Sequence, residues 1–319
     1  MAHAWKACWV QALRGSNPLS SAAAEFSPWW FVWVREGNLM EKSDIPPTIW
    51  MYWDQGLEAA PEVVKICAES WKALNPEYEL IVLDHDSINL HVNVDSLFPD
   101  WRSLSIQQSS DLLRLLLLAQ RGGVWVDATL FCLRPLHEWL DPHHCSGVYL
   151  VDVPDSTDKL FDTFFLASAP KGQFVSRWLS TFVRYLDAVP QPMTHQMTKR
   201  LLKRIPPLKS KLGRVLFTTR LFRNRFGAPY FIVHYLGTRS LVTSARSLIV
   251  WMRRQRTMTG KFSALLRSDN PGAQLEADLE AERYPFIKLT HKALPDQVER
   301  LEAVMRVLRA WLARQIKAG

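Results

Sequence analysis

A leucine-rich helix that runs directly into a buried strand constrains the fold of this chain more than any other segment. The pattern predicts a helix from about Ser105 to Arg121, which the pair Gly122-Gly123 ends. Val124-Trp125-Val126 then indicates a buried strand that finishes at Asp127. In open α/β sheets, ligands bind beyond the carboxyl ends of the strands. We therefore predict an α/β fold with Asp127 at its ligand-binding edge.

The rest of the chain supplies the remaining layers of such a fold. Upstream, a βαβ unit is expected from a strand at Thr48–Trp53, a helix that begins at Pro61 and ends at Asn75-Pro76, and a strand at Glu79–Leu83. Downstream, the pattern predicts strands at Gly147–Val151, Phe164–Ser168 and Ile287–Leu289, and helices at Gln173–Asp187 and Asp296–Ile316. Hydrophobic residues make up 48% of the chain, which is ample for a buried core.

A chain of 319 residues is about twice the usual size of one domain. We expect a Trp-rich, helical N-terminal appendage at 1–44 and a core domain at 45–187. A basic, mostly helical segment is expected at 188–268, and a return to the core with a closing amphipathic helix at 269–319.

The positive charge is concentrated in one segment. Ala188–Ser268 contains 17 Lys and Arg and no Asp or Glu, so the rest of the chain carries a net charge of −9. Such a segment can attract anionic lipid, nucleic acid or a phosphate-bearing acceptor. Leu248–Met252, followed by Arg253 and Arg254, has the pattern of an interfacial helix. Solvated basic faces on core-facing helices explain the charge equally well. No nucleic-acid module accompanies it, so we expect no nucleic acid partner.

The four cysteines show no Cys-x-x-Cys pair and no Cys/His ligand spacing, which favours a reducing compartment. No apolar run approaches the length of a membrane-spanning helix, and the first residues lack the pattern of a signal peptide. We therefore expect a cytoplasmic protein, with peripheral contact to the inner face of a membrane as an open alternative.

Three charged side chains form the densest constellation. Asp111 and Arg114 lie at positions i and i+3 of the predicted helix, so a carboxylate and a guanidinium can face the same polar ligand. Asp127 beside a bound diphosphate would need a divalent cation to offset the repulsion between like charges. Taken one by one, the same residues fit a surface salt bridge, a helix stop and a strand-terminal cap.

Six blocks of sequence carry a family resemblance. The chain resembles the capsular polysaccharide synthesis glycosyltransferases, which are relatives of the Och-type mannosyltransferase family 32 and of the large clostridial glucosylating toxins. The strongest block is Ser109–Phe131, and the others are Ile45–Gly56, Ala60–Asp84, Phe161–Phe174, Phe231–Leu236 and Pro285–Lys292.

The resemblance implies a GT-A fold, a Rossmann-like mixed sheet flanked by helices that binds a nucleotide-sugar donor. It implies transfer of the sugar to an acceptor hydroxyl with retention of anomeric configuration. Asp111 and Arg114 match the pair that contacts the sugar and ribose of the donor. Asp127 matches the first carboxylate of an Asp-x-Asp motif that binds Mn²⁺ or Mg²⁺, whereas the third position is Thr129, which could hold a metal-bound water.

Other residues gain expected roles from the resemblance. Trp50 and Trp53 match base contacts, with core packing as the alternative, and Gly123 belongs to the expected donor-binding set. His291 and Lys292 match a late loop that supplies a metal ligand and a phosphate-binding lysine, and His234 is a weaker alternative ligand. Asp162 matches a position on the sugar and acceptor side.

The expected reaction has a nucleoside diphosphate as its leaving group. Catalysis would depend on positioning and on stabilisation of the departing phosphate by metal, Lys292 and backbone donors, without a covalent nucleophile. The acceptor would be a capsule, O-antigen or lipid-linked glycan. Two alternatives remain open, a catalytically inactive glycan-assembly partner and a membrane-surface scaffold.

Overall fold

The computed structural model describes most of the chain beyond the N-terminal appendage. The described residues are 44–152, 159–186, 193–204, 213–219, 221, 228–257, 260–261, 265, 268–281, 284–290 and 297–318. The predictions made for 1–43, for His291 and for Lys292 lie outside these residues.

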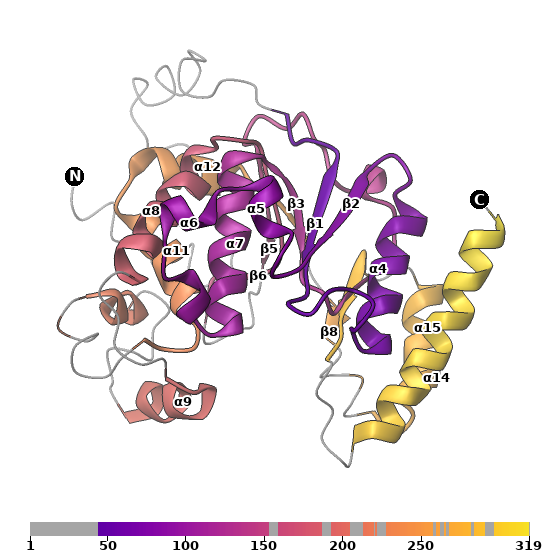
Figure 1. Cartoon of the computed structure of the whole chain (residues 1–319). Coiled ribbons are helices and arrows are strands. Elements are labelled where there is room, and N and C mark those ends of the chain that lie inside the picture. The colour runs from indigo at the N-terminus through magenta and orange to yellow at the C-terminus, as the bar shows by residue number, and fades with distance from the viewer. Residues whose placement is uncertain are drawn as a thin grey trace, which may run out of the picture.

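The described chain contains both helices and strands (Figure 1). The strands are β1 Thr48–Tyr52, β2 Glu79–Leu83, β3 Gly123–Val126, β4 Leu130–Cys132, β5 Val148–Asp152, β6 Phe161–Ser168, β7 Gln255–Thr257, β8 Gly260–Lys261 and β9 Phe286–Lys288. The α-helices are α4 Glu62–Leu74, α5 Ile88–His91, α6 Val94–Leu97, α7 Ile106–Gln120, α8 Gln173–Leu186, α9 His195–Arg204, α11 Ile232–Val242, α12 Ala245–Arg253, α14 Pro271–Glu280 and α15 Val298–Ala318. Short 3₁₀ helices cover Trp101–Ser103, Leu136–Glu138 and Gly213–Thr218.

Six of these strands form one mixed sheet in the order β2-β1-β3-β6-β5-β7. β1 is parallel to β2 and β3, β6 is antiparallel to β3 and β5, and β7 is parallel to β5. A smaller sheet has the order β4-β9-β8. The predicted α/β fold with a mixed sheet flanked by helices is therefore confirmed.

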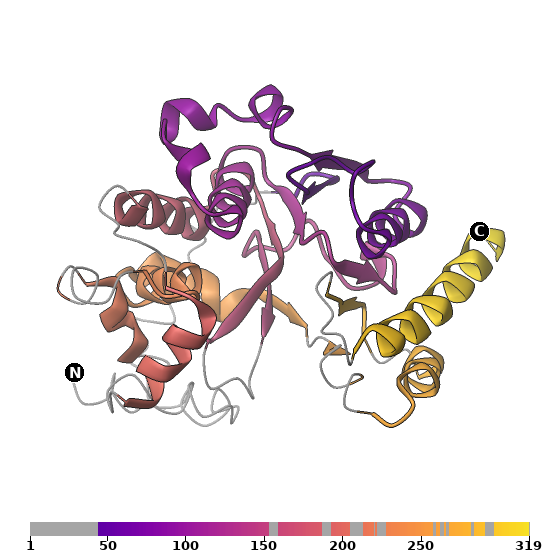
Figure 2. The ribbon, with the colours of Figure 1, turned by 60° about the horizontal axis from the view of Figure 1, so that its bottom comes forward.

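Helices cover both faces of the large sheet, as Figures 1 and 2 show. Side chains alternate along a strand, so Trp50 and Tyr52 of β1 join one hydrophobic cluster while Ile49 and Met51 join the other. α7, α8 and α11 pack in the first cluster, and α4, α14 and α15 pack in the second. Burial on both faces explains why the strands are almost continuously apolar.

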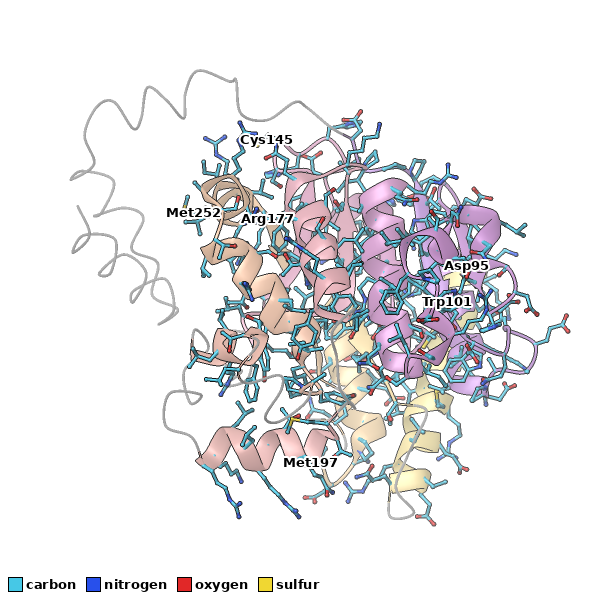
Figure 3. The ribbon with its side chains drawn as sticks, turned by 60° about the vertical axis from the view of Figure 1, so that its left-hand side comes forward. Asp95, Trp101, Cys145, Arg177, Met197 and Met252 are labelled. Atoms are coloured by element: carbon cyan, nitrogen blue, oxygen red, sulfur yellow. The ribbon has the colours of Figure 1, made fainter. Side chains whose placement is uncertain are left out.

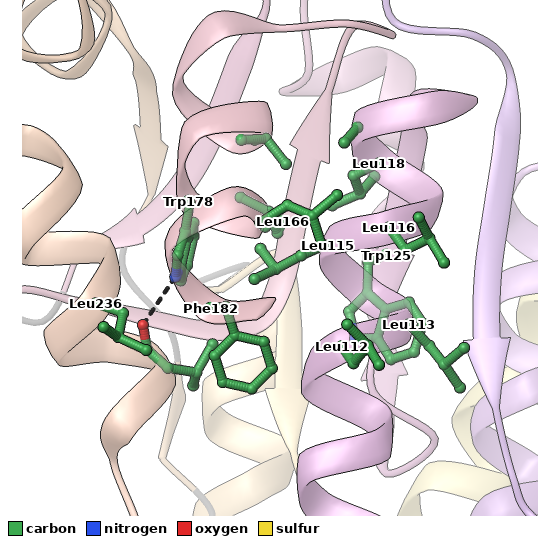
Figure 4. Close-up of a cluster of buried hydrophobic side chains, with 14 of the residues drawn as sticks. Leu112, Leu113, Leu115, Leu116, Leu118, Trp125, Leu166, Trp178, Phe182 and Leu236 are labelled. Carbon is green, nitrogen blue, oxygen red and sulfur yellow. Dashed lines mark hydrogen bonds between the residues drawn. The ribbon is translucent and has the colours of Figure 1, made fainter. Parts of the chain in front are cut away.

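α7 is the central helix of the first layer. Ser105 begins it with a capping box, because the Ser105 side chain accepts from the backbone of Gln108 while the Gln108 side chain accepts from the backbone of Ser105. Its leucines pack against α8 and β6, and the Trp178 indole donates to the carbonyl of Val233 in α11 at 2.8 Å (Figure 4). This packing holds α7, and with it Asp111 and Arg114, rigidly beside the sheet.

The glycine pair makes the turn from α7 into β3 as predicted. Gly122 and Gly123 have φ angles of +69° and +97°, which other residues rarely adopt. A Cβ at Gly123 would lie 2.6 Å from the carbonyl oxygen of Thr48, and one at Gly122 would lie 2.7 Å from Pro170. Only glycine lets β3 start this close to β1.

The predicted elements that fall on described residues are confirmed with small shifts. β6 starts at Phe161, three residues before the predicted start, and β9 is Phe286–Lys288 rather than Ile287–Leu289. β4, β7 and β8 were not predicted, because strands of two or three residues are too short to show a periodicity. β7 and β8 both lie within the basic segment 188–268, which was expected to be mostly helical. Within the described residues, no helix is long and apolar enough to span a membrane.

Candidate functional site

The carboxyl edge of β3 gathers the charged side chains of the site. The backbone N–H of Asp127 donates to the carbonyl of Phe164 in β6 at 2.8 Å. Because β6 is antiparallel to β3, its first residues, including Asp162, lie at this same edge. The edge therefore brings together residues from β3, β6 and, through Arg114, α7.

Four side chains at this edge form an ion-paired cluster, which we call the charged quartet: Asp111, Arg114, Asp127 and Lys288. Arg114 donates to Asp111 through Nη1 and to Oδ1 of Asp127 through Nη2, the latter at 2.9 Å. Lys288 Nζ donates to Oδ2 of Asp127 at 2.7 Å. The Arg114 side chain is only 4% exposed, whereas those of Asp127 and Lys288 are 25% and 30% exposed. A ligand can thus reach the Asp127–Lys288 side of the quartet.

Trp125 fixes the orientation of the Asp127 carboxylate. Its indole N–H donates to Oδ1 of Asp127 at 3.0 Å, and the guanidinium of Arg114 lies over its ring at 5.1 Å from the centroid. Oδ1 therefore accepts from two donors and Oδ2 from a third. Both oxygens of this carboxylate are engaged within the protein.

The quartet shifts the pKa values of its two acids in opposite directions. Burial raises the pKa of Asp111 to about 6, and the nearby Asp127 charge adds to this while Arg114 opposes it. Burial also acts on Asp127, but the Lys288 ammonium and the Arg114 guanidinium outweigh it and hold its pKa well below the usual range. Asp127 is therefore ionised at neutral pH, and Asp111 titrates just below it.

Asp162 lies in a second group with Lys159 and His234, which we call the Asp162 trio. Lys159 Nζ donates to Asp162 Oδ1, and His234 Nε2 lies 3.7 Å from the same oxygen and 3.4 Å from Thr163 Oγ1. Burial lowers the pKa of His234 to about 4, and the Lys159 charge adds to this. His234 is therefore neutral at physiological pH. As expected, it sits on an apolar helix, α11.

The predicted donor-binding residues Trp50 and Gly123 lie away from this edge. The Trp50 ring is buried in the core, and its indole N–H donates to the carbonyl of Gly122 at 2.8 Å. Gly123 starts β3, at the opposite end of the strand from Asp127. Both residues thus serve the packing of β1 against β3. Trp53 follows the carboxyl end of β1, so of the two tryptophans it is the one placed at the edge of the quartet.

The described residues do not fit a metal site that contains two carboxylates. Thr129 replaces the second carboxylate and is buried, with 6% of its surface exposed. Asp127 is already paired with two cationic side chains. Within the described residues, no group of three or more His, Cys, Asp or Glu could hold a metal ion. His291, the remaining predicted ligand, lies outside those residues.

Sequence reasoning missed two cationic residues of the site. Lys288 belongs to the block Pro285–Lys292, in which the family resemblance gives the phosphate-binding role to Lys292. A lysine at the end of the apolar strand Phe286–Lys288 was the available signal, because such a position is costly without a partner. Lys159 lies two residues before β6 and pairs with Asp162 at spacing i, i+3, and no periodicity marks it.

The basic segment contains both exposed and paired cations. On α9, the charged residues Lys199, Arg200, Lys203 and Arg204 are exposed, as is Met197 (Figure 3). At the end of α12, Met252 is also exposed, but Arg254 donates to Asp152 at 2.6 Å and lies 3.5 Å over the Trp251 ring. The interfacial pattern expected at Leu248–Met252 thus gives a helix that is partly packed on the core, and Arg254 is bound within the protein.

Three comparisons relate the chain to known proteins. A family model described as capsular polysaccharide synthesis protein matches residues 34–205. An O-glycosyltransferase braB of Annulohypoxylon truncatum is 25% identical over 183 residues, which are 50% of this chain and 43% of that protein. An initiation-specific alpha-1,6-mannosyltransferase of Candida albicans is 29% identical over 108 residues, 31% of this chain and 28% of that protein.

This chain therefore spans less than half the length of these curated relatives. Among solved structures, the PaToxG glycosyltransferase is similar with a TM-score of 0.41 and 15% identity, over 86% of this chain and 89% of that chain.

Proposed function

We propose that this chain, which belongs to the capsular polysaccharide synthesis protein family, is a glycosyltransferase of the GT-A type. It would move a sugar from a nucleotide-sugar donor to a hydroxyl of a glycan acceptor. The observation that carries this proposal is the charged quartet at the carboxyl edge of β3, where open α/β sheets bind their ligands. The curated relatives named above are also described as glycosyltransferases.

Each member of the quartet has a chemical role in this proposal. Asp111 would accept hydrogen bonds from hydroxyls of the donor sugar or ribose, while Arg114 holds both carboxylates in place. Asp127 would hold Lys288 in place through Oδ2, so that the ammonium also faces the donor phosphate. The quartet is neutral when all four groups are ionised, so a diphosphate meets no net negative charge there.

In the reaction, the acceptor oxygen would bond to the anomeric carbon while the bond from that carbon to the diphosphate oxygen breaks. The bonding electrons leave with the nucleoside diphosphate, and the hydroxyl proton passes to a departing phosphate oxygen. Attack from the face that the diphosphate leaves gives retention of configuration and needs no covalent nucleophile. The chain would contribute positioning and electrostatic stabilisation of the leaving group.

The Asp162 trio would lie on the acceptor side. Asp162 is buried and ionised, because its contacts with His234 and Lys159 lower its pKa against the effect of burial. The acceptor we propose is a capsule, O-antigen or lipid-linked glycan. A phosphate-bearing or membrane-borne acceptor would match the exposed cations of α9.

Calorimetric titration with UDP, GDP, UDP-glucose and GDP-mannose tests the proposal, with Asp127→Asn as the site variant. Asp95→Asn is a matched control, because Asp95 also accepts from a tryptophan and an arginine but lies away from the quartet, on α6. We expect one nucleotide series to bind the wild type and the control and to bind Asp127→Asn at least about tenfold more weakly. Binding of no nucleotide would favour the scaffold, and binding without sugar transfer or donor hydrolysis would favour the inactive partner.

A further inference from the structure

We propose that Lys288 supplies the cationic contact to the donor diphosphate that a divalent metal supplies at an Asp-x-Asp motif, so that donor binding requires no divalent cation. This inference rests on the proposed function and assigns a residue to the phosphate subsite of the same site. The contacts of Asp127, the position of β9 and the charge of the quartet carry it.

The existing contacts of Asp127 disfavour metal binding to its carboxylate. Mg²⁺ demands an octahedral set of oxygen ligands, and Mn²⁺ likewise prefers carboxylate, carbonyl and water oxygens. Asp127 is the carboxylate at this position, and its Oδ1 and Oδ2 accept from Arg114, Trp125 and Lys288. A metal on Oδ2 would have to displace the Lys288 ammonium at 2.7 Å and would then face the Arg114 charge across the same carboxylate.

The small sheet fixes Lys288 where it can bridge to a ligand. In the β4–β9 ladder, Lys288 pairs with Leu130, three residues after Asp127. The next residue, Leu289, donates its backbone N–H to the carbonyl of Thr129 at 2.8 Å. The strand therefore holds Lys288 against the Asp127–Thr129 loop by backbone hydrogen bonds, so that its place does not depend on the ion pair alone.

The ammonium of Lys288 can contact a carboxylate and a phosphate at once. It has three N–H donors, and Asp127 Oδ2 accepts one of them. The side chain is 30% exposed, so further donors can reach a ligand at the edge. A divalent metal at an Asp-x-Asp motif bridges carboxylate and diphosphate in the same way. Without Lys288, the three remaining charges of the quartet would sum to −1 and repel a diphosphate.

Titration of UDP and GDP in EDTA and in Mn²⁺ tests this inference, with melting curves to confirm folding. For the wild type, we expect the Kd of the bound nucleotide to agree within about threefold between the two buffers. Lys288→Met should weaken binding in EDTA by about 10- to 100-fold, the range expected for a lost charge-assisted hydrogen bond. Mn²⁺ should restore part of this loss, because Oδ2 of Asp127 is then free. Lys288→Arg should keep binding in EDTA.

The controls separate this inference from the proposed function. Lys65→Met removes an exposed lysine of α4 that is paired with Glu62, and it should leave the Kd unchanged. The nucleosides uridine and guanosine lack phosphate, so each should bind Lys288→Met with the same Kd as it binds the wild type. Wild-type binding that is present in Mn²⁺ and lost in EDTA would overturn the inference and leave the proposed function intact. Absence of nucleotide binding in both buffers would overturn the two together.

Discussion

Two clusters of the same three residue types occur in this molecule, in different surroundings. In each, an aspartate accepts from a tryptophan N–H and from an arginine whose guanidinium lies over the tryptophan ring. In the quartet these residues are Asp127, Trp125 and Arg114. In the second cluster they are Asp95, Trp101 and Arg102, and Figure 3 shows Asp95 and Trp101.

Solvent is the main difference between the clusters. The Arg102 and Asp95 side chains are 47% and 44% exposed, whereas Arg114 is 4% exposed. Water screens the charges of the exposed cluster, and salt screens them further. In the quartet the charges interact at lower dielectric, and Lys288 and Asp111 extend the network. The same contacts therefore tie Trp101 and Arg102 to Asp95 in the exposed cluster, whereas in the quartet they form part of an electrostatic site.

Removal of the arginine should give the largest difference between the two clusters. Arg114→Met leaves the carboxylates of Asp111 and Asp127 partly buried without their shared cation, which we expect to lower the free energy of unfolding by about 3–5 kcal/mol. Arg102→Met removes the cation beside Asp95, but the Asp95 carboxylate is already solvated. This substitution should therefore leave the melting temperature nearly unchanged. Thermal and denaturant unfolding of the two variants measures this. Equal losses would show that burial does not set the strength of the quartet.

Removal of the aspartate charge should reduce sugar transfer in the quartet but not in the exposed cluster. Asp127→Asn keeps the shape of the side chain but weakens its contacts to Arg114 and Lys288, so we expect kcat/KM for sugar transfer to fall by about 10²- to 10³-fold. Asp95→Asn should retain wild-type kcat/KM. Steady-state kinetics with the nucleotide sugar found by titration measures both. Wild-type turnover by Asp127→Asn would refute the assignment of the site.

The pH dependence of donor binding should arise from the quartet alone. Burial raises the pKa of Asp111 to about 6, so below this pH Asp111 gains a proton, loses its charge and no longer pairs with Arg114. We expect donor affinity to be constant above pH 7 and to fall by about tenfold in total as Asp111 becomes protonated, because one charge-assisted hydrogen bond to the donor is weakened. The hydrogen bond from Trp101 lowers the pKa of Asp95, so the exposed cluster stays ionised over this range.

Titration of a nucleotide sugar between pH 5 and pH 8 measures this dependence, because its diphosphate diester does not titrate there. Asp111→Asn should bind with a flat pH profile at the weaker, low-pH level. Asp95→Asn should keep the wild-type profile. A pH-dependent profile that persists in Asp111→Asn would assign the titration to another group.

The parts of the site that lie close together in the sequence could be predicted from it, and the distant part could not. Leucine periodicity, a glycine pair and a short apolar run predict α7, its end and β3, and these place Asp111, Arg114 and Asp127. Lys288 lies 161 residues after Asp127 and reaches it through a three-residue strand. Such a strand has no measurable period, and its pairing with β4 is decided by tertiary packing.

Burial explains the other differences between prediction and structure. A tryptophan in an apolar strand fits a base contact as well as a core position, and only the fold places the Trp50 ring in the core. Arg254 follows an apolar helix in a segment without acidic residues, yet its partner Asp152 comes from β5, before that segment begins. Charge patterns along the sequence therefore predict the sign of a surface better than they predict which cations are paired.

The smallest expected difference concerns the two indole N–H groups. Trp125 and Trp101 are equally buried, each with 1% of its surface exposed, so replacement by phenylalanine removes similar packing from both. The hydrogen bond from Trp125 to Asp127 lies inside the quartet, and its loss should cost about 1 kcal/mol more than the loss of the bond from Trp101 to Asp95. Denaturant unfolding of Trp125→Phe and Trp101→Phe measures the difference. A larger loss in Trp101→Phe would mean that packing around that ring, rather than the surroundings of the hydrogen bond, decides the comparison.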